Sequence, residues 1–488
     1  MSSPHSWRLA PLLVVLILAG CASSDNIAPQ SQMLDNQQLQ LAQPKVSSLA
    51  LSPQWWRVLE DPQLDALMSQ SLQTSPSLKQ AAARVREAQS VVGQADAANG
   101  PNLDLNGSSK REKVSQNTLQ PFLQSYPDKP LYETSNTLGL NLSYEFDWWG
   151  KYRNQVNAAN AQVNAARAEQ QQAALTLTSS VASVYYQLQS NFALKNVLQQ
   201  EVDNNDRLAE LRTKQYQAGI YGIEIPQQTK AQADTAKQQI IQLQSQGEQL
   251  KHQLAALTGQ GPNATQNLRQ VPLPDITRLA PKGELTTDLL GKRPDITAQR
   301  QLVESYDQRV KAARKEFYPS LSITGFAGLS TTNFQGTNPN LLETASQAWN
   351  FAPAISLPIF HAGALRSKLS EESALYDEAV ESYNQTILNA VRETADAITI
   401  QQSSQLQLQQ AISASQSMQK VYNVADARYA AGIIGRDELL ISQSQYLQQQ
   451  QSELNASNNL LQAKIGLIRS LGGGYQAPVS DGSQNKTI

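Results

Sequence analysis

Two long stretches of the chain carry apolar residues at helical spacing and contain neither glycine nor proline. They are residues 151–218 and 364–431, and each has 68 residues. An unbroken helix of that length extends about 100 Å, which is longer than any globular core. The apolar positions of the first stretch recur by threes and fours, as in packed long helices: Val156, Ala159, Val163, Ala166, Ala173, Leu177 and Val184.

A short glycine-containing turn follows each long stretch, at 218–222 and at 431–435, and a helical pattern resumes after it. Glycine ends helices because it adopts the left-handed backbone conformation without a steric penalty. The sequence therefore predicts two long helical hairpins whose tips are these turns.

Apolar and polar residues alternate in four shorter segments, two ahead of each long helix. This period of two predicts strands with one apolar and one polar face. The clearest segment is 138–146, and Leu103 and Leu105 begin its partner. In the second half, alternation over 321–330 predicts a third strand, and the fourth contains Phe351, Ile355, Leu357 and Ile359.

Glycine and proline recur at equal spacings in the two halves of the chain, which predicts an internal tandem repeat. The turn Tyr216–Gly222 and the turn Tyr429–Gly435 are offset by 213 positions, and the pairs Pro76/Pro101 and Pro294/Pro319 by 218. The predicted repeats cover 64–259 and 285–472, with a proline-containing linker at 260–284 and a polar tail at 473–488.

The first residues predict a lipoprotein leader. Residues 11–20 are apolar, too few to span a membrane but suited to a signal peptide. They end in Leu18-Ala19-Gly20-Cys21, which resembles a bacterial lipobox. We therefore predict a signal peptide at 1–20, covalent lipid on Cys21 and a lipidated segment at 21–63; an ordinary leader with a chance cysteine is the alternative. Alanine rather than aspartate at position 22 resembles the signal for transfer to the outer membrane.

Composition argues against catalysis and against nucleic acid. The chain has 39 Lys+Arg and 41 Asp+Glu, so it has no basic field for nucleic acid, and its single cysteine excludes an internal disulfide. It has three histidines and no zinc-protease, nucleophile-elbow or Walker A motif. We expect no enzyme activity, no metal site and no cofactor besides the lipid on Cys21, with His252 and His361 at the surface or in packing.

Four strands cannot close a barrel, and the smallest membrane barrels have about eight. If the strands cross the outer membrane, the chain must therefore oligomerise. Two copies supply eight strands, whose interior side chains fill, whereas three supply twelve and leave a pore. We expect a mixed α/β membrane protein that forms a homotrimer. Asn141, Ser143 and Ser322 would line the pore, and the lipid-facing residues would include Leu140, Leu142, Ile355 and Leu357.

An ordered set of motifs, together with the duplication, resembles the TolC-type outer-membrane efflux proteins in their lipoprotein branch. The motifs are Trp55-Trp56, Asp61-Pro62-Gln63-Leu64, Phe146-Asp147-Trp148-Trp149-Gly150-Lys151, Arg293-Pro294-Asp295-Ile296, Phe317-Tyr318-Pro319-Ser320, both Tyr-x-Ala-Gly-Ile tips and Leu471-Gly472-Gly473-Gly474-Tyr475. The resemblance implies a homotrimer with a twelve-stranded barrel and an α-helical periplasmic tunnel. It also implies a periplasmic adaptor and an inner-membrane pump, usually of the RND type, that exports drugs and other toxic compounds.

The resemblance also assigns roles to the helical tips. Adaptor contact is expected at Gly219, Ile220, Gly222, Gly432, Ile433 and Gly435, where glycine admits a partner's backbone and isoleucine offers an apolar anchor. Residues expected to take part in closing the tunnel are Tyr216, Glu224, Arg428, Tyr429, Arg436 and Glu438. The family's gate arginine falls on Ile434 and its first acidic position on Ile225, so the gate network differs here. The alternative is that these charges only solvate helix ends.

Three other functions are compatible with the sequence. A pump-independent porin would conduct without an adaptor. A structural coiled-coil lipoprotein would bridge outer membrane and periplasm without forming a channel. Type I protein secretion would use the same architecture for a different cargo. The segment between Ser108 and Asn136 is expected to form an external loop.

Overall fold

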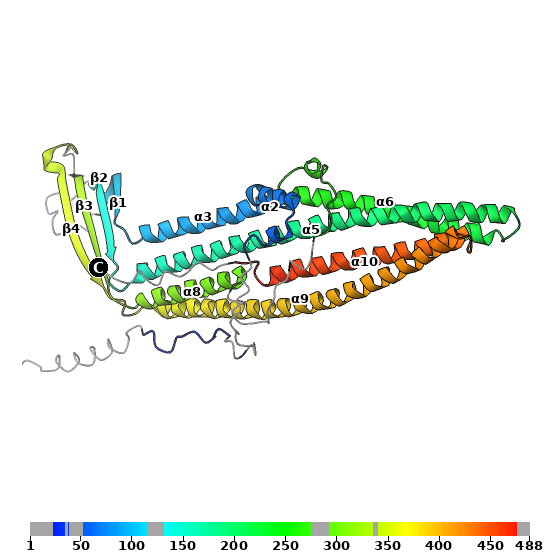
Figure 1. Ribbon diagram of the computed structural model, residues 1–488. Coiled ribbons are helices and arrows are strands. Elements are labelled where there is room, and N and C mark those ends of the chain that lie inside the picture. Colours follow the sequence, from blue (N-terminus) through cyan, green and yellow to red (C-terminus); the bar gives the residue numbers. More distant parts are fainter. Residues whose placement is uncertain are drawn as a thin grey trace, which may run out of the picture. The chain divides into compact units, whose positions relative to one another are not determined.

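The structure is a computed structural model that describes residues 23–34, 38, 52–115, 131–274, 279, 292–334 and 340–475 (Figure 1). The predicted signal peptide, Cys21 and the end of the tail lie outside these residues. The chain divides into two compact units. The sheet unit comprises Met1–Gln32, Arg86–Asn164 and Gln301–Glu381, and the tip unit comprises Met33–Val85, Ala165–Arg300 and Ser382–Ile488.

The sheet unit contains one antiparallel sheet of four strands, which confirms the predicted strands. They are β1 (Asn102–Val114), β2 (Leu131–Phe146), β3 (Ser320–Phe334) and β4 (Gln347–Ser356), side by side in that order (Figure 1). The pattern of alternation places two strands in each half of the chain, and the structure pairs them across the halves as well. Strand β2 pairs with β3 over a long register, in which Leu140 lies opposite Ala327.

The predicted end of the fourth strand is wrong. Strand β4 ends at Ser356, so Leu357 and Ile359 lie beyond it. Pro358 interrupts the strand pairing, because proline has no backbone N–H to donate to a neighbouring strand. Pro353 is tolerated within β4, because β4 is an edge strand.

The expected loop between Ser108 and Asn136 is also partly wrong, because β1 continues to Val114 and β2 begins at Leu131. Ser109 lies opposite Asn136, and its hydroxyl is 2.7 Å from the Asn136 Oδ1 atom. Residues 116–130 lie outside the described residues. The added parts of β1 and β2, at 109–114 and 131–135, consist mainly of polar residues and have no apolar face, so the sequence pattern does not predict a strand there.

A short N-terminal segment lies against helix α9 (Ala364–Ala430) in the sheet unit. The Asp377 Oδ1 atom accepts hydrogen bonds from the backbone N–H groups of Gln30 and Ser31, both at 2.8 Å. The Arg366 guanidinium donates to the Ser23 carbonyl. Ile27 packs beside the buried Leu369. Side chains of α9 thus fix the backbone of a segment that has no regular structure of its own.

The long helices α5 (Lys151–Gln217) and α9 have 67 residues each and confirm the prediction (Figure 1). The shorter helices are α2 (Pro62–Thr74), α3 (Pro76–Ala97), α6 (Glu224–Leu257), α8 (Pro294–Lys315) and α10 (Arg436–Ser470), with 3-10 turns η1 (Trp55–Leu59), η2 (Pro262–Thr265) and η4 (Thr344–Ser346). None of the helices in the described ranges is long and apolar enough to cross a membrane.

Both long helices end in the same way. Gly219 and Gly432 each have φ +73°. The next residue, Ile220 or Ile433, donates its N–H to the carbonyl five positions earlier at 2.9 Å. This is the Schellman arrangement, which satisfies carbonyls left free at a helix end. Each predicted tip is therefore a closed helix end, followed after a short turn by a returning helix.

The main core of the tip unit joins η1 and α2 to three longer helices. Trp55, Leu64 and Met68 are buried against α5, α6 and α10. The Tyr185 hydroxyl in this core donates a hydrogen bond to the Asp61 carboxylate at 2.8 Å. Burial, and then the hydrogen bond to the Asp61 carboxylate, raise the pKa of Tyr185 far above its ordinary value, so the phenol stays protonated as the donor.

Two glycines in the tip unit permit close contact where short helices meet longer ones. Gly259 has φ +69°, and a Cβ atom there would lie 2.8 Å from the Thr74 carbonyl oxygen. Gly472 has φ +86°, and its Cβ would lie 2.4 Å from the Lys292 carbonyl oxygen. Both positions exclude a side chain by conformation and by contact with backbone.

We expect Gly472→Ala to destabilise the protein by about 2 kcal/mol or more, because it combines a positive φ with a clash against backbone. The matched control is Gly466→Ala within α10, where a Cβ would have no neighbour within 4 Å. This control should be neutral or slightly stabilising. Thermal unfolding of the purified proteins measures both, and equal melting temperatures would contradict the role of Gly472.

Candidate functional site: strand faces and helical tips

The sheet has one apolar face and one polar face. Directly paired residues share a face, so Leu105, Leu140, Ala327 and Trp349 form one apolar row across all four strands. Large side chains on this face are exposed: Trp349 by 81% and Ile355 by 75%. A contiguous apolar surface of this kind marks contact with a membrane or with another protein.

The predicted pore-lining residues lie together on the opposite face. Asn141 is paired with Phe326, Ser143 with Thr324, and Glu145 with Ser322. The register thus places Asn141, Ser143 and Ser322 together. The predicted lipid-facing residues Leu140, Leu142 and Ile355 share the apolar face, whereas Leu357 does not belong to the sheet.

Aromatic residues cluster where the strands end and the helices begin. The Trp149 indole donates to the Pro319 carbonyl at 2.7 Å, and its ring centroid lies 5.1 Å from that of Tyr318. The neighbouring Trp148 is exposed. Trp and Tyr gather at membrane–water interfaces, because their rings are apolar and their tips polar. The sequence motifs contain these residues, but only the structure brings the two segments together.

The expected adaptor-contact residues form the tips of the two hairpins in the tip unit. Ile220 is 62% exposed and Ile433 is 71% exposed. Added Cβ atoms at Gly219 and Gly432 would have no neighbour within 4 Å, so the space beside each turn is open. At Gly222 and Gly435 an added Cβ would instead meet the side chains of Glu224 and Asp437. Each tip therefore presents one isoleucine beside an uncovered backbone turn.

The predicted gate residues lie near the tips but do not form one network. Tyr216 and Tyr429 are in the last turns of α5 and α9, and Arg436 begins α10. Arg428 and Glu438 line one groove between α9 and α10. Among the described residues, no hydrogen bond or ion pair joins Tyr429, Arg436 and Glu438 to one another.

The structure instead shows an ion pair that the sequence analysis missed. A guanidinium nitrogen of Arg212 on α5 lies 3.2 Å from the Asp437 carboxylate on α10, and these side chains are only 13% and 17% exposed. The guanidinium also lies over the Tyr221 ring, 4.7 Å from its centroid. This contact joins the two hairpins. A signal existed, because Asp437 and Glu224 correspond at the offset of 213 and both lie in the first turn of a returning helix.

Further polar contacts join α5 to α10 away from the tip. The Asn204 amide donates to the Leu440 carbonyl at 2.8 Å. The Ser183 hydroxyl and the Gln462 side chain are also hydrogen-bonded. Glutamines and asparagines that look like surface residues in the sequence therefore serve as contacts between the hairpins. No cluster of ligating side chains suited to a metal ion occurs among the described residues.

An antiparallel sheet with an exposed apolar face and two long helical hairpins has the fold of an outer-membrane channel with a helical tunnel. The chain belongs to the outer membrane efflux protein family, whose model matches residues 67–260 and 285–473. It is thus the outer-membrane channel component of a tripartite efflux system of a Gram-negative bacterium, and not an enzyme. The family resemblance inferred from the sequence is confirmed.

Individual relatives are similar over almost their whole length. The multidrug resistance outer membrane protein MdtP of Escherichia coli K12 is 32% identical over 469 residues, which are 94% of this chain and 95% of MdtP. The putative multidrug resistance outer membrane protein MdtQ of the same strain is 30% identical, over 96% of this chain and 97% of MdtQ. The solved structure of the outer membrane protein VceC from Vibrio cholerae matches with a TM-score of 0.75 and 31% identity, over 87% of this chain and 100% of VceC.

We expect Asp437→Asn to loosen both tips, because it leaves the Arg212 guanidinium largely buried without its charge partner. Hydrogen exchange of tip peptides should accelerate by about tenfold, which corresponds to about 1.4 kcal/mol of local opening free energy. The matched control is Lys214→Ala, which removes the exposed 2.7 Å ion pair with Glu210 on the same helix. Exposed pairs contribute little, so its exchange should not change. Equal protection in both variants would contradict the role of Asp437.

Proposed function

We propose that three copies of the chain form a duct that passes drugs or other toxic small molecules across the outer membrane. The observation that carries this proposal is the incomplete sheet. Strands β1 and β4 are its edges and leave backbone groups unpaired, while one sheet face is apolar and exposed. Backbone groups inside a bilayer must be paired, so strands cross it only in closed barrels. Twelve strands from three copies close with room for a pore.

In this assembly the polar sheet face lines the pore. Asn141, Ser143 and Ser322 would contact water and cargo, while Leu140 and Ile355 would contact lipid. The aromatic cluster at Trp149 and Tyr318 supports a membrane boundary at that end of the strands. The passage would be passive, because the chain belongs to a family of channels and the energy would come from the pump.

An exposed apolar row on α9 supports contact with a second copy. Leu388, Leu406 and Val424 are spaced 18 residues apart, which is five helical turns and thus one meridian of the helix. All three are exposed in the single chain. A neighbouring copy would cover this row and continue the helical wall of the tunnel.

We expect Leu140→Arg to prevent assembly in the outer membrane, because arginine on a lipid-facing strand costs about 2–4 kcal/mol at mid-bilayer. The matched control is Asn141→Arg, one residue away on the other face, which should still assemble and should shift ion selectivity toward anions. Heat-modifiable migration of membrane extracts and planar-bilayer conductance report the two effects. If both variants assembled equally, the proposed orientation of the sheet would be wrong.

The tips would contact a periplasmic adaptor, with Ile220 and Ile433 inserted into the partner and Gly219, Gly222, Gly432 and Gly435 admitting its backbone. The exposure of both isoleucines and the open space beside Gly219 and Gly432 support this. The inner-membrane pump would be of the RND type, as the resemblance implies. MdtP and MdtQ are called multidrug resistance proteins, which supports drugs as cargo.

The gate would close where the two hairpins of one chain meet. The Arg212–Asp437 ion pair would hold them together, and docking of the adaptor would separate them. Tyr216, Glu224, Arg428, Tyr429, Arg436 and Glu438 would add contacts between copies in the closed trimer. Tyr216 and Tyr429 are exposed in the single chain, which supports contacts of these two residues with a neighbouring copy.

Two further features belong to the proposal. Cys21 would carry lipid in the outer membrane, and the hold of α9 on the backbone of Gln30 and Ser31 would keep that anchor beside the chain. The chain would also be a tandem duplication. The equal lengths of α5 and α9, and of α3 and α8, support it.

Site-specific photocrosslinking from Ile220 and Ile433 in living cells tests the partnership. We expect both positions to capture one periplasmic adaptor, identified by mass spectrometry of the adducts. The matched control is the exposed Ile241 on α6, which lies away from both tips in the sequence and should not capture it. Adducts of Ile220 and Ile433 with the channel alone, in cells that express their pumps, would favour a pump-independent porin or a structural lipoprotein. A secretion partner in place of a drug pump would favour type I secretion.

A further inference from the structure

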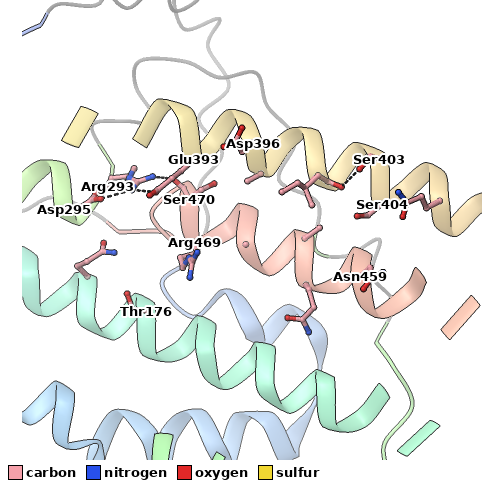
Figure 2. A pocket seen from close by; sticks show the side chains of 17 residues that line it. Thr176, Arg293, Asp295, Glu393, Asp396, Ser403, Ser404, Asn459, Arg469 and Ser470 are labelled. Carbon is pink, nitrogen blue, oxygen red and sulfur yellow. Dashed lines mark hydrogen bonds and ion pairs between the residues drawn. The ribbon is translucent and has the colours of Figure 1, made fainter. Parts of the chain in front are cut away.

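A polar cavity of about 880 Å³ lies in the tip unit (Figure 2). Helices α5, α9 and α10 form its walls together with the start of α8, so a single chain builds it. Cavities of this size hold small organic ligands. Neither the tips nor the strand faces include it.

The arginine at one side of the cavity is already neutralised. The Arg293 guanidinium binds both carboxylate oxygens of Asp295, at 3.1 and 2.7 Å. It also donates to Glu393 at 3.1 Å and to the Ser470 carbonyl at 2.9 Å. Asp396, the third acid of the wall, lies 3.5 Å from Arg392. Each acidic side chain of the cavity therefore has an arginine partner.

A second arginine in the lining has no such partner. Arg469 belongs to the last turn of α10, is exposed and lines the cavity. Within the described part of the chain, no hydrogen bond or ion pair satisfies its guanidinium. Figure 2 shows Arg469 on the side of α10 that faces Thr176 of α5, away from Glu393 and Asp396 on α9. Its five N–H donors are thus free for an anionic ligand.

The rest of the lining suits a ligand with an apolar body. Ala397, Ile400 and Ala463 supply apolar surface, and Ile400 is exposed. Gly466 lies within α10 and also lines the cavity, yet a Cβ there would meet nothing within 4 Å. Glycine within a helix is about 1 kcal/mol less favourable than alanine. No neighbouring atom requires this glycine, and its effect is to leave the wall of the cavity open.

We propose that this cavity is a binding site for amphipathic organic anions. Arg469 would bind a carboxylate or sulfonate in a charge-assisted, bidentate contact. The apolar body of the ligand would lie along α10 at Gly466, which is three residues before Arg469 and so on the same side of that helix. Only the biological role of this site rests on the proposed duct: the site would hold such solutes briefly as they pass out of the cell. Binding itself needs no pump, adaptor or open gate.

Equilibrium dialysis of the full-length protein in lipid nanodiscs tests the proposal, with empty nanodiscs as the blank. The probes are naphthalene-2-carboxylate, the neutral 2-naphthylmethanol and the cationic 2-naphthylmethylammonium. We expect the wild type to prefer the carboxylate. Arg469→Gln should weaken carboxylate binding by about tenfold, as expected for loss of one charge-assisted contact, and leave the alcohol unchanged. Arg207→Gln replaces an exposed arginine of α5 outside the cavity, and this matched control should bind like the wild type.

A second variant keeps the charge and removes the space. Gly466→Leu places a side chain into the open wall and should weaken binding of both the carboxylate and the alcohol. This variant tests the proposal if Arg469→Gln does not fold. Equal carboxylate binding by the wild type and either variant would overturn the proposal. Preferred binding of the ammonium probe would overturn it too, because the acidic wall would then dominate.

Two other readouts separate this proposal from the proposed function. If Arg469→Gln folds but loses its trimeric state in size-exclusion chromatography, Arg469 binds a neighbouring copy and the ligand proposal fails. Conductance in planar bilayers should be the same for the wild type and Arg469→Gln. A wild type that binds the carboxylate but does not conduct would contradict the duct and leave the binding site established.

Discussion

A single chain cannot pair all the backbone hydrogen-bonding groups of its own sheet. Four antiparallel strands leave the outer backbone groups of β1 and β4 without partners, and one face of the sheet presents Trp349, Ile355 and other large apolar side chains to the surroundings. In water such a face is covered by other protein, and in lipid such edges must be closed. The outer-membrane location of the family and the proposed assembly of three copies both agree with this one constraint.

In the tip unit, polar side chains supply much of the contact between the two hairpins. Its hairpins meet through Ser183 and Gln462, through Asn204 and the Leu440 carbonyl, and through Arg212 and Asp437. Each contact is polar and modest in energy, because it replaces hydrogen bonds to water. The hairpins also share an apolar core, because Leu461 and Ile465 of α10 belong to one buried cluster with Tyr185 of α5. The fold thus combines an apolar core around Trp55 and Tyr185 with polar contacts between the hairpins at Asn204 and Arg212.

Periodicity predicts the elements of this protein well and their partners poorly. The long helices follow from two runs without glycine or proline, and the strands from alternation such as that of Leu138 to Phe146. The β2–β3 pairing did not follow, because alternation defines a face but not a neighbour. Proline at 358 ends β4 early, although the apolar pattern continues through Leu357 and Ile359. The Arg212–Asp437 ion pair could not be predicted, because the two residues are 225 positions apart in the chain. Its neighbours Arg436 and Glu438 are more conspicuous in the sequence but form no ion pair with each other.

The seam between β2 and β3 has a consequence for how the ring is divided among chains. On one side of it lies a hairpin from the first half of the chain, and on the other a hairpin from the second half. Within the chain, an edge of one hairpin meets an edge of the other, and in a ring of three the remaining edges, β4 and β1, would meet in the same antiparallel manner. A ring of twelve strands is therefore equally a ring of six hairpins. In the proposed trimer the symmetry would be threefold rather than sixfold, because two hairpins belong to one chain and are free to differ from each other.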